Sequence, residues 1–419
     1  MGSKVFEFIA NENERQNKNI ELIASENFVS DDIRLAVGSC FTNKYCEGYP
    51  EDRKSGNIGR YYGGCENAND LEEYCCDKWR EVFHTNYHVN VQPHSGSSAN
   101  MEAFAAVLKP GDTILAMSLD NGGHLTHGSR VNFSGKLYNF VFYDVTADGY
   151  IDYEDIEKKI RLYHPHLILA GASAYSREID FKRIYDIIQK VKIDDAYDNI
   201  ASQNFDHEGN CTTPDYEDYS PYFMVDMAHI AGLVATGYHQ TPFGLADIIT
   251  TTTHKTLRGP RGGLIFCRPH LAKKVDSSVF PGHQGGPLMH VIAGKAICAE
   301  EACSEEFADY IKQVIKNADA MAEAFWHFGY EIVSKGTDNH MFLLDFSNTH
   351  PTLTGAKVQE ELDKIGITLN KNCVPNEQRS PKETSGVRIG TPAMTTKGWK
   401  EQDFIECARV IDSAIRGMV

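Results

Sequence analysis

Lys255 stands between a β-branched run and a loop rich in glycine and proline. Residues 248–253 are typical of a buried strand, and residues 257–263 cannot continue a regular helix or strand. A lysine held at such a junction loses hydration, which disfavours its charged form and leaves a nucleophilic amine able to form a Schiff base. The alternative is a lysine on a solvated strand end, which this segment alone favours because most lysines lie on surfaces.

Asp226 closes a second strand-like run, and His229 follows three residues later. Open α/β sheets bind ligands at the carboxyl ends of their strands. A carboxylate there can keep a heteroaromatic nitrogen protonated, which is what pyridoxal phosphate needs to act as an electron sink. A helix cap beside a core histidine explains the same two residues equally well.

Three further segments could bind anions or an aromatic ring. Ser95, Gly96 and Ser97 precede a helix, where N–H groups, hydroxyls and the helix dipole favour a phosphate, although a serine there is usually only a cap. His124 lies in a glycine-containing loop and could stack on a ring; no histidine pattern elsewhere supports metal ligation, so no metal is expected. Arg388, inside an apolar strand bounded by glycines, needs a substrate carboxylate or an internal salt bridge.

Glu47 lies near two tyrosines, Tyr45 and Tyr62, in segments with glycine-rich turns. A carboxylate and phenols in such turns can transfer protons, although turns carry these residues routinely.

The five segments around Lys255, Asp226, Ser95, His124 and Arg388 together supply an amine, a carboxylate for a ring nitrogen, a phosphate cradle, a stacking imidazole and a guanidinium. An enzyme that acts on amino acids with pyridoxal phosphate requires this set.

Charge and composition narrow the classes of protein. The 419 residues carry a net charge of -17, which disfavours nonspecific binding to nucleic acids and to membrane surfaces. The hydrophobic fraction of 42% and the charged fraction of 24% are ordinary for a globular protein. Eleven cysteines without a CxxC pair, and no apolar run typical of a signal peptide or a membrane span, predict a cytoplasmic protein with reduced thiols.

Strand-like and helix-like segments alternate between residues 70 and 266, which predicts a mainly parallel sheet covered by helices. Beyond residue 286 the pattern changes to one long helix followed by short strands and helices, typical of a smaller α+β domain. The expected strands lie near residue 89 and at 113–117, 140–143, 166–172, 222–225, 248–253, 264–267, 331–333, 341–345 and 387–389. The expected helices lie at 71–83 (capped by Asn69 or Asp70), 99–108, 152–163, 181–191, 291–327, 354–365 and 400–415.

The chain is therefore divided into an N-terminal arm at 1–30, a large domain at 31–286 and a small C-terminal domain at 287–419. Two polar segments with few aliphatic residues, 51–59 and 194–219, look like surface insertions that bury little area.

From Glu21 to near its end the chain resembles the serine hydroxymethyltransferase family. The matching strings follow one another in family order: ELIASEN, TNKYCEGYP, RYYGGCE, NVQPHSGSSAN, GGHLTHGS, SAYSREIDF, VDMAHIAGL, TTTTHKTLRGPRGG, FPGHQGGP, GTDNHMFLLD and VRIGTPAMTTKG. The resemblance implies a fold-type I pyridoxal-phosphate-dependent transferase, similar to aspartate aminotransferase. Its large domain would hold a mainly parallel seven-stranded sheet, and its smaller C-terminal domain would be α+β.

The same resemblance implies the reversible conversion of L-serine and tetrahydrofolate to glycine and 5,10-methylenetetrahydrofolate. It also implies a homodimer, or a tetramer, whose active sites are shared between subunits. Lys255 would form the Schiff base with pyridoxal 5′-phosphate, Asp226 would bind its pyridine nitrogen, His229 would lie near the ring oxygen and His124 would stack over the ring. Further cofactor contacts would come from Ser95, Gly96, Ser97, Ser173, Arg261 and Tyr45, and from Gly285 and Gly286 of the partner chain.

The substrate contacts implied by the resemblance form two sets. Ser25 and Arg388 would hold the substrate carboxylate, and Leu119, Gly123 and Leu125 match the residues that contact the pterin. Glu47, Tyr45 and Tyr62 resemble partner-chain residues that handle protons on the serine hydroxyl and on folate. The implied catalytic residues are Lys255, Glu47, Tyr62 and His229.

Two departures from the family pattern bear on these assignments. The insertion at 51–59 falls between Glu47 and Tyr62, so it bears on how these two side chains are placed. The longer acidic segment at 194–219 precedes Asp226, and we expect it to loop out without disturbing that residue.

Two other functions compete with this one. A folate-independent aldolase acting on threonine or related β-hydroxy amino acids would use the same ring chemistry. The other is a catalytically silent scaffold or an RNA-binding homologue, which would need no ring chemistry. Two observations argue against this second function: Lys255, Asp226 and Arg388 are all intact, and the chain is acidic overall.

Overall fold

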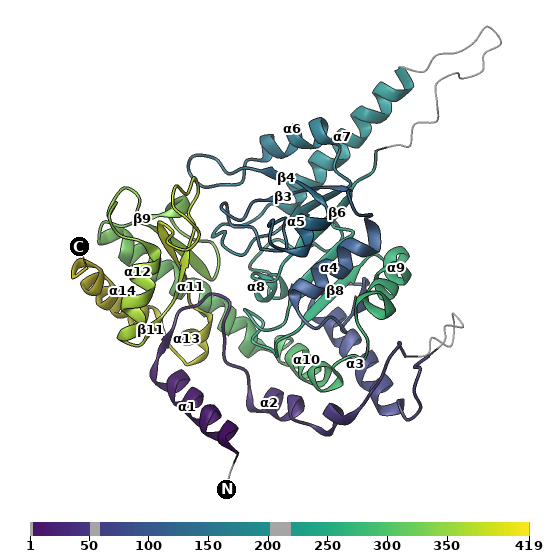
Figure 1. Ribbon diagram of the computed structural model, residues 1–419, viewed down its shortest axis with the longest axis horizontal. Helices are drawn as coiled ribbons and strands as arrows, with labels where there is room; N and C mark the ends of the chain where they lie inside the picture. Colours follow the sequence, from purple (N-terminus) through teal and green to yellow (C-terminus); the bar gives the residue numbers. More distant parts are fainter. Residues whose placement is uncertain (1–2, 51–58, 202–218, 419) are drawn as a thin grey trace, which may run out of the picture.

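The computed structural model describes residues 3–50, 59–201 and 219–418. A seven-stranded sheet with the strand order β2-β8-β7-β6-β5-β3-β4 forms the centre of the larger part (Figure 1). Pairs among β7, β6, β5, β3 and β4 are parallel, and β8 runs antiparallel to both β2 and β7. The strands are β2 (His88–Asn90), β3 (Thr113–Met117), β4 (Asn139–Tyr143), β5 (Leu167–Ala170), β6 (Tyr222–Asp226), β7 (Ile248–Thr252) and β8 (Gly263–Cys267).

Alternate residues of these strands enter two hydrophobic cores, because successive side chains point to opposite faces of a sheet. On one face, Ile114, Leu167 and Met224 pack with α4 (Gly96–Val107) and α9 (Ala272–Ser277). On the other face, Leu115 and Ile168 join the larger core. The longer helices contributing to that core are α3 (Glu66–Val82), α6 (Tyr153–Tyr163), α7 (Phe181–Ala201), α10 (Met289–Ala302) and α11 (Glu305–His327).

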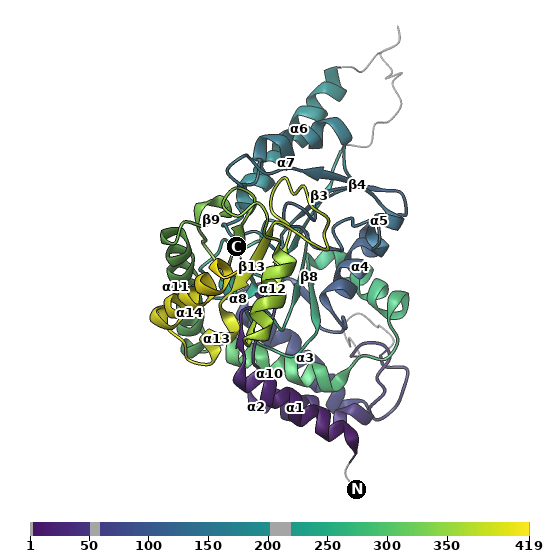
Figure 2. The same cartoon turned by 60° about the vertical axis from the view of Figure 1, so that its left-hand side comes forward.

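A second, four-stranded antiparallel sheet has the order β12-β13-β10-β9 and a core of its own (Figure 2). The segment after α1 (Lys4–Lys18) joins this part of the chain, since β1 (Ile20–Glu21) pairs in parallel with β11 (Ile367–Thr368). The other elements here are β9 (Glu331–Ile332), β10 (Met341–Asp345), α12 (Gly355–Lys364), β12 (Asn370–Asn372), β13 (Gly386–Gly390), α13 (Pro392–Thr396) and α14 (Glu401–Arg416).

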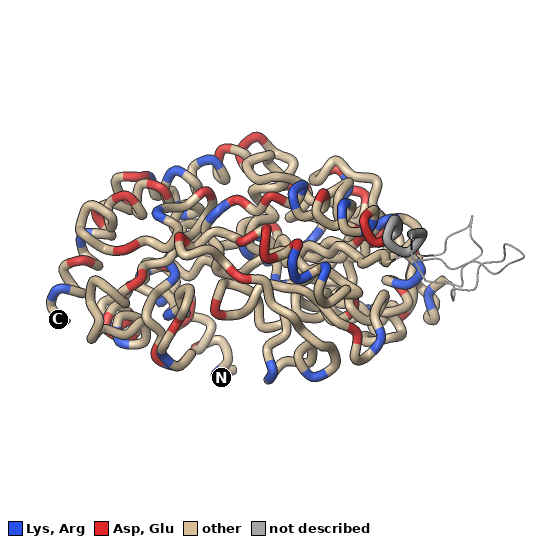
Figure 3. Tube along the Cα trace, turned by 90° about the horizontal axis from the view of Figure 1, so that it is seen from above, with Lys and Arg blue, Asp and Glu red and all other residues tan. Residues whose placement is uncertain are grey.

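The short connecting elements complete the described chain. They are α2 (Asp31–Val37), η1 (Cys40–Asn43), α5 (Phe133–Leu137), α8 (Ala231–Ala235), η2 (Pro269–Leu271), η3 (Ser278–His283) and η4 (Val333–Lys335). Acidic and basic residues are interleaved along the outer helices (Figure 3). Every helix of the described residues is too short or too polar to cross a lipid bilayer.

The fold class is confirmed, and every strand expected in the large sheet is present. Several helix boundaries were predicted wrongly. The helix expected at 291–327 is two helices, because Ser304 caps a new helix by accepting a hydrogen bond from the amide of Phe307. The helix expected at 71–83 begins earlier, at Glu66, so its cap position is Cys65 rather than Asn69 or Asp70.

The segment expected to be inserted at 194–219 begins inside a helix. Helix α7 continues to Ala201, so the first residues of that segment are helical, and 202–218 lie outside the described residues. At the far end, the hydroxyl of Tyr219 donates to the carbonyl of Pro165, which ties the chain back to the sheet before β6 begins. Of the segment 51–59, residues 51–58 lie outside the described residues.

Candidate active site

Lys255 lies in the loop that joins the antiparallel strands β7 and β8. The hairpin is in register with Thr252 opposite Gly263, and the amide of Thr253 donates to the carbonyl of Gly262. The lysine Nζ donates to Thr252 Oγ1 at 2.8 Å. Its main-chain carbonyl accepts from Asn27 Nδ2 at 2.9 Å and from the amide of Arg258 at 3.0 Å. Both ends of the residue are therefore fixed.

The half-buried Lys255 amine is easier to deprotonate than an ordinary lysine. Burial lowers its pKa from 10.5 to about 8; the nearby Asp226 carboxylate opposes this shift, and the charges of Arg388 and Arg261 add to it. Near physiological pH an amine with this pKa is neutral far more often than an ordinary lysine amine, and its neutral form can act as a nucleophile. The structure thus favours the reactive interpretation of Lys255 over the solvated strand end.

We expect the Lys255 amine of the cofactor-free protein to react with an uncharged acylating reagent at a rate that rises through about pH 8 and then levels off. A lowered pKa means that half of these amines are already neutral near pH 8, instead of near 10.5. Mass spectrometry of the Lys255 peptide across pH measures this, and the exposed Lys273 in the same digest reports the reagent's own pH dependence. A midpoint near 10.5 would contradict the expectation.

Asp226 is the last residue of β6, at the carboxyl edge of the parallel strands. Its Oδ2 accepts from Asn100 Nδ2 at 2.8 Å and from His127 Nε2 at 3.3 Å, and its Oδ1 accepts from the amide of Ala228 at 3.0 Å. Burial would raise the pKa of this carboxyl, but the hydrogen bonds from His127 and Asn100 act against burial, and the pKa lies well below its usual value. Asp226 is therefore a buried anion, as a partner for a protonated ring nitrogen must be.

The tautomer of His127 follows from its contacts. Its Nδ1 accepts from the amide of His124 at 3.2 Å, so the proton sits on Nε2 and points at Asp226. His124, His127 and Asp226 form a group whose ligand atoms lie within 4.8 Å of one another. Because the His127 nitrogen facing Asp226 carries a proton, this group is arranged as hydrogen-bond partners rather than as metal ligands.

The two other histidines of interest are neutral near pH 7. Burial lowers the pKa of His124 to about 4. His229 is fully buried; burial, followed by the charge of Lys255, lowers its pKa well below the usual value, and its Nδ1 lies 3.1 Å from Nε2 of His340. A neutral imidazole at each position can stack on a ring or share a hydrogen bond without adding positive charge.

Ser95 caps α4, since its Oγ accepts from the amide of Ser98 at 3.2 Å. The structure also holds this loop close to Lys255. A Cβ on Gly96 would lie 2.5 Å from Cγ2 of Thr252, the residue that accepts the lysine's hydrogen bond, and a Cβ on Gly263 would lie 2.3 Å from the carbonyl oxygen of Ser95. Glycines are therefore required where the helix N-terminus meets the hairpin. An anion bound at this terminus would lie next to the lysine loop.

Lys295 fixes the other side of the same loop, a role that the sequence did not reveal. This buried lysine donates to three main-chain carbonyls, those of Val91 at 2.7 Å, Pro93 at 3.0 Å and Gly263 at 2.8 Å. It therefore joins the end of β2 to the start of β8. In the sequence it is one lysine of a long helical stretch, with no local signal of this contact.

Arg388 lies in β13 with its side chain almost completely buried. Its Nε donates to Asn370 Oδ1 at 3.2 Å, and its Nη1 donates to the carbonyl of Ser173. Burial alone lowers its pKa to about 10, and within the described residues no carboxylate forms an ion pair with it. The internal salt bridge is therefore not observed there, and the guanidinium retains capacity for a carboxylate from outside the chain.

Ser25 belongs to the segment that packs against the end of β13. The amide of Gly390 donates to the carbonyl of Leu22, and a Cβ on Gly390 would lie 2.3 Å from Cα of Ala24. Asn27, two residues beyond Ser25, donates to the carbonyl of Lys255 and to the hydroxyl of Tyr310. The N-terminal segment thus connects the strand that carries Arg388 to the loop that carries the lysine.

A cavity of about 270 Å³ lies beside Arg388. Leu119, Gly123 and Leu125, the residues that match the pterin contacts, line it together with His124 and Ser173. The sequence reasoning did not include its other walls: Ala174 follows Ser173, and the rest come from the distant strand β12, the residue after it and the loop before β13. These further residues are Ala174, Lys371, Asn372, Cys373, Pro381 and Thr384.

A second group gathers around Tyr45. Its ring stacks edge-on against Tyr62 with centroids 5.1 Å apart, and its hydroxyl lies 3.2 Å from Glu47 Oε1. A Cβ on Gly285 would lie 3.2 Å from Glu47 Oε1, and one on Gly286 would lie 3.3 Å from the Tyr45 ring. Tyr45 and Tyr62 are 54% and 42% exposed, so the chain itself leaves these phenols uncovered.

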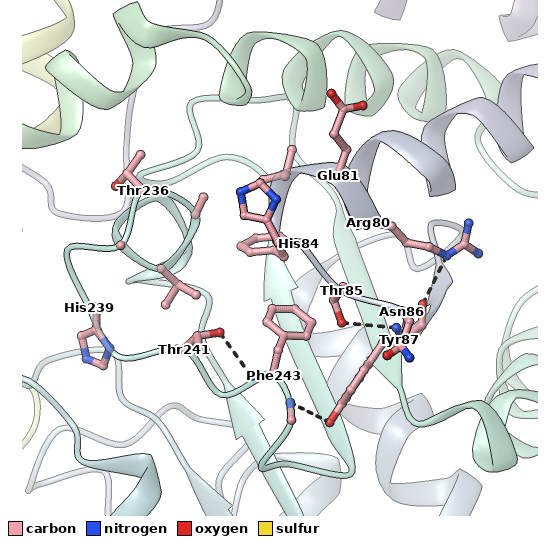
Figure 4. A pocket seen from close by; sticks show the side chains of 16 residues that line it. Arg80, Glu81, His84, Thr85, Asn86, Tyr87, Thr236, His239, Thr241 and Phe243 are labelled. Atoms are coloured by element: carbon pink, nitrogen blue, oxygen red, sulfur yellow. Dashed lines mark hydrogen bonds between the residues drawn. The ribbon is translucent and has the colours of Figure 1, made fainter.

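The predicted site residues thus fall into two groups. Asp226, Arg388 and Arg261 are close enough to Lys255 for their charges to shift its pKa, whereas Glu47 is not among the groups that do so. Arg261 itself is exposed. A wide hollow of about 1230 Å³ lies elsewhere, between the C-terminal end of α3 and the loop after α8 (Figure 4). Arg80, His84, Thr236 and Phe243 line it, and none of the predicted site residues does, so its size does not mark the reactive centre.

The donor set of the first group fits pyridoxal phosphate. It offers a deprotonatable amine, a carboxylate held ionised, a helix N-terminus closed off by glycines, and neutral imidazoles at His124 and His229. Asp226, Lys255 and the helix N-terminus would hold the ring nitrogen, the aldehyde carbon and the phosphate respectively. A family model described as serine hydroxymethyltransferase matches residues 1–198 and 215–411 of the chain.

Proposed function

Because this chain belongs to the serine hydroxymethyltransferase family, we propose that its two groups of site residues act together in that family's reaction. The chain is a pyridoxal-phosphate-dependent transferase that interconverts serine and glycine, with tetrahydrofolate as the cosubstrate that accepts the hydroxymethyl carbon. The proposal concerns which residues do which part of this work and how the chains assemble.

The buried Arg388 carries the assignment of the amino-acid site. A guanidinium with no ion-pair partner among the described residues costs free energy unless an anion satisfies it. A planar carboxylate accepts two parallel hydrogen bonds from such a fork. Arg388 therefore binds the carboxylate of serine or glycine, and Ser25, on the segment packed against β13, completes that contact.

Bound pyridoxal phosphate withdraws electrons from the substrate Cα, which makes loss of the hydroxymethyl group possible. The chain's own residues prepare the site for this chemistry. Lys255 supplies the amine that holds the cofactor, Asp226 keeps the ring nitrogen protonated, and the N-terminus of α4 with Ser95, Gly96 and Ser97 binds the phosphate. His124, held neutral, would stack on the ring, and the neutral His229 would lie near its oxygen.

Glu47 handles the proton of the serine hydroxyl, and Tyr62 and Tyr45 hold it in place. The Tyr45 hydroxyl is 3.2 Å from the Glu47 carboxylate and the Tyr62 ring packs on Tyr45, so the three side chains act as one unit. Leu119, Gly123 and Leu125 face the cavity beside Arg388, where the pterin of tetrahydrofolate would lie close to the amino acid.

The chain works as a homodimer, or as a tetramer built from such dimers. The Glu47 group is exposed and separate from the Lys255 group, so a site that needs both is completed when a second copy brings its Glu47 group to the lysine of the first. Gly285 and Gly286, which lie against Tyr45 and Glu47, come with the same partner.

We assign the protein to the cytoplasm. The ten cysteines that the structure describes are all free thiols, in keeping with a reducing compartment.

The reaction is tested with serine labelled at its side-chain carbon. We expect the holoenzyme to move the label to tetrahydrofolate and to release glycine at a rate that depends on the folate concentration. A rate of glycine release that does not change when tetrahydrofolate is omitted would favour the folate-independent aldolase instead. Failure of the purified chain to bind pyridoxal phosphate would revive a silent scaffold.

A further inference from the structure

Glu47 and Tyr62 stay together although the chain between them is long. The amide of Tyr61 donates to the carbonyl of Glu47 at 2.9 Å. Gly48, with a φ of 96°, is pressed against the returning chain: a Cβ there would lie 3.1 Å from the carbonyl oxygen of Gly59 and 3.3 Å from Cα of Arg60. Residues 46–48 and 59–61 therefore lie directly against each other. We call these two segments together the neck.

Arg60 closes the neck from inside. Its Nη1 donates to the carbonyls on either side of Glu47, those of Cys46 at 3.0 Å and Gly48 at 2.7 Å. Its Nε donates to Asn69 Oδ1 at 2.8 Å, and its Nη2 pairs with Glu72 Oε2. The side chain is only 2% exposed. A single guanidinium thus binds the main chain that carries Glu47 and anchors it to α3.

A second amide supports the same neck. Gln92 Nε2 donates to the carbonyl of Gly48 at 2.9 Å and to Glu72 Oε1 at 2.8 Å. Glu72, 5% exposed, therefore accepts from Arg60 with one oxygen and from Gln92 with the other. Gln92 belongs to the segment that leads to Ser95 at the N-terminus of α4. The neck, α3 and this segment therefore share one buried polar network.

We propose that Arg60 is a positioning residue, which sets the placement of Glu47 and Tyr62 for the partner subunit's reaction. The placement of these two side chains then does not depend on the residues between 50 and 59. This inference rests on the proposed function, because it takes Glu47 and Tyr62 as the groups that handle protons. The guanidinium of Arg60 is buried, and its hydrogen bonds all go to groups of the protein itself. It acts through the two carbonyls that flank Glu47 and through Tyr62, two residues further along the chain.

Arg60 could position Glu47, as a clamp on the main chain around it, or it could only stabilise the fold through its ion pair with Glu72. A stabilising pair, once removed, would lower the unfolding temperature and leave kcat of the remaining folded protein intact. A clamp sets the distance between a proton-handling carboxylate and its substrate, and a displacement of about 1 Å at such a group can cost about 100-fold in rate. Arg60→Lys keeps a positive charge but loses the fork that reaches several acceptors at once.

The experiment compares folded holoenzymes. We expect Arg60→Lys to bind pyridoxal phosphate and serine within about twofold of the wild type and to lose about 100-fold in kcat, with a displaced pH profile of kcat. A chain in which two glycines replace residues 51–58 keeps all four acceptors of Arg60 and should retain kcat. A normal kcat in Arg60→Lys, or a lost kcat in the shortened chain, would overturn the inference.

Mixed dimers give the second measurement. Co-expressed Arg60→Met and Lys255→Gln chains, carrying different tags, should recover activity, because each mixed dimer then contains one site with an intact lysine and an intact neck. Random pairing leaves about a quarter of the sites intact. Arg60→Met with Glu47→Gln should recover nothing, because every site then has a defect in the same group.

The control pair, Glu47→Gln with Lys255→Gln, tests whether the active site is shared between chains separately from whether Arg60 acts through Glu47. If this pair fails to recover activity, the site is not shared between chains and the proposed function is wrong in that respect. If it recovers activity and Arg60→Met with Lys255→Gln does not, Arg60 does not act through the Glu47 group and the inference is wrong. Purification of the mixed dimers through both tags excludes chains that fail to assemble.

Discussion

Replacing Lys255 with glutamine should lower the turnover of serine by at least about 1000-fold, the scale seen when a covalent catalyst loses its nucleophile. The glutamine side chain is of similar length and can still donate a hydrogen bond to Thr252 Oγ1. The main-chain contacts of residue 255 with Asn27 and Arg258 do not involve the side chain. The hairpin, and with it the proposed contacts of Asp226 and α4 with the cofactor, should therefore persist.

Two measurements on the same preparation check this expectation: the rate of glycine formation and the amount of pyridoxal phosphate that remains bound after dialysis. The matched control is Lys273→Gln on α9, a change of the same chemistry at an exposed lysine, which should leave turnover unchanged. Wild-type turnover in Lys255→Gln would remove Lys255 from the reaction altogether.

The second large effect is expected at Arg388. Truncating one member of a buried, hydrogen-bonded charge pair costs roughly 2–5 kcal/mol, and each 1.4 kcal/mol is a factor of ten in affinity. Arg388→Ala should therefore weaken the binding of serine and glycine by between about 30-fold and several thousand-fold. Arg388→Lys should recover only part of this loss, because an ammonium cannot offer two parallel donors.

Binding of both amino acids to the holoenzyme measures this effect, and the affinity for pyridoxal phosphate serves as the internal reference. Arg388 also donates to Asn370 and to the carbonyl of Ser173, so some loss of unfolding temperature is expected as well. A lower unfolding temperature with unchanged affinity for serine would assign Arg388 to the fold instead of to the substrate.

The large sheet could be predicted from the sequence because most of its strands are buried on both faces. In the sequence, residues 113–117 and 248–252 form continuous apolar or β-branched runs. The strands β3 (Thr113–Met117) and β7 (Ile248–Thr252) coincide with these runs. The break between α10 and α11 is harder to see, because Cys303 and Ser304 interrupt an apolar pattern that resumes at once. In that place a local capping hydrogen bond, rather than hydrophobic periodicity, decides where the helix ends.

The candidate site was predictable where a residue's own neighbours indicate its chemistry. Asp226 ends an apolar strand, Arg388 lies inside one and Lys255 follows one closely, and a charge in such a place requires an explanation. His127, Asn100 and Lys295 gave no comparable signal, because their roles arise from contacts with residues far away in the sequence. Asn100 reaches Asp226 across 126 positions, and Lys295 reaches Val91 across 204.

The hairpin formed by β7 and β8 divides the chain into places where length is free and places where it is fixed. Thr252 is paired with Gly263, so the loop that carries Lys255 cannot gain or lose a residue without shifting the strand register or displacing the amine. At the neck, by contrast, residues 46–48 and 59–61 contact one another directly, so the number of residues between them can change without moving either side of the neck. Variation in length among relatives of this chain should therefore concentrate between residues 50 and 59 and be absent between 252 and 263.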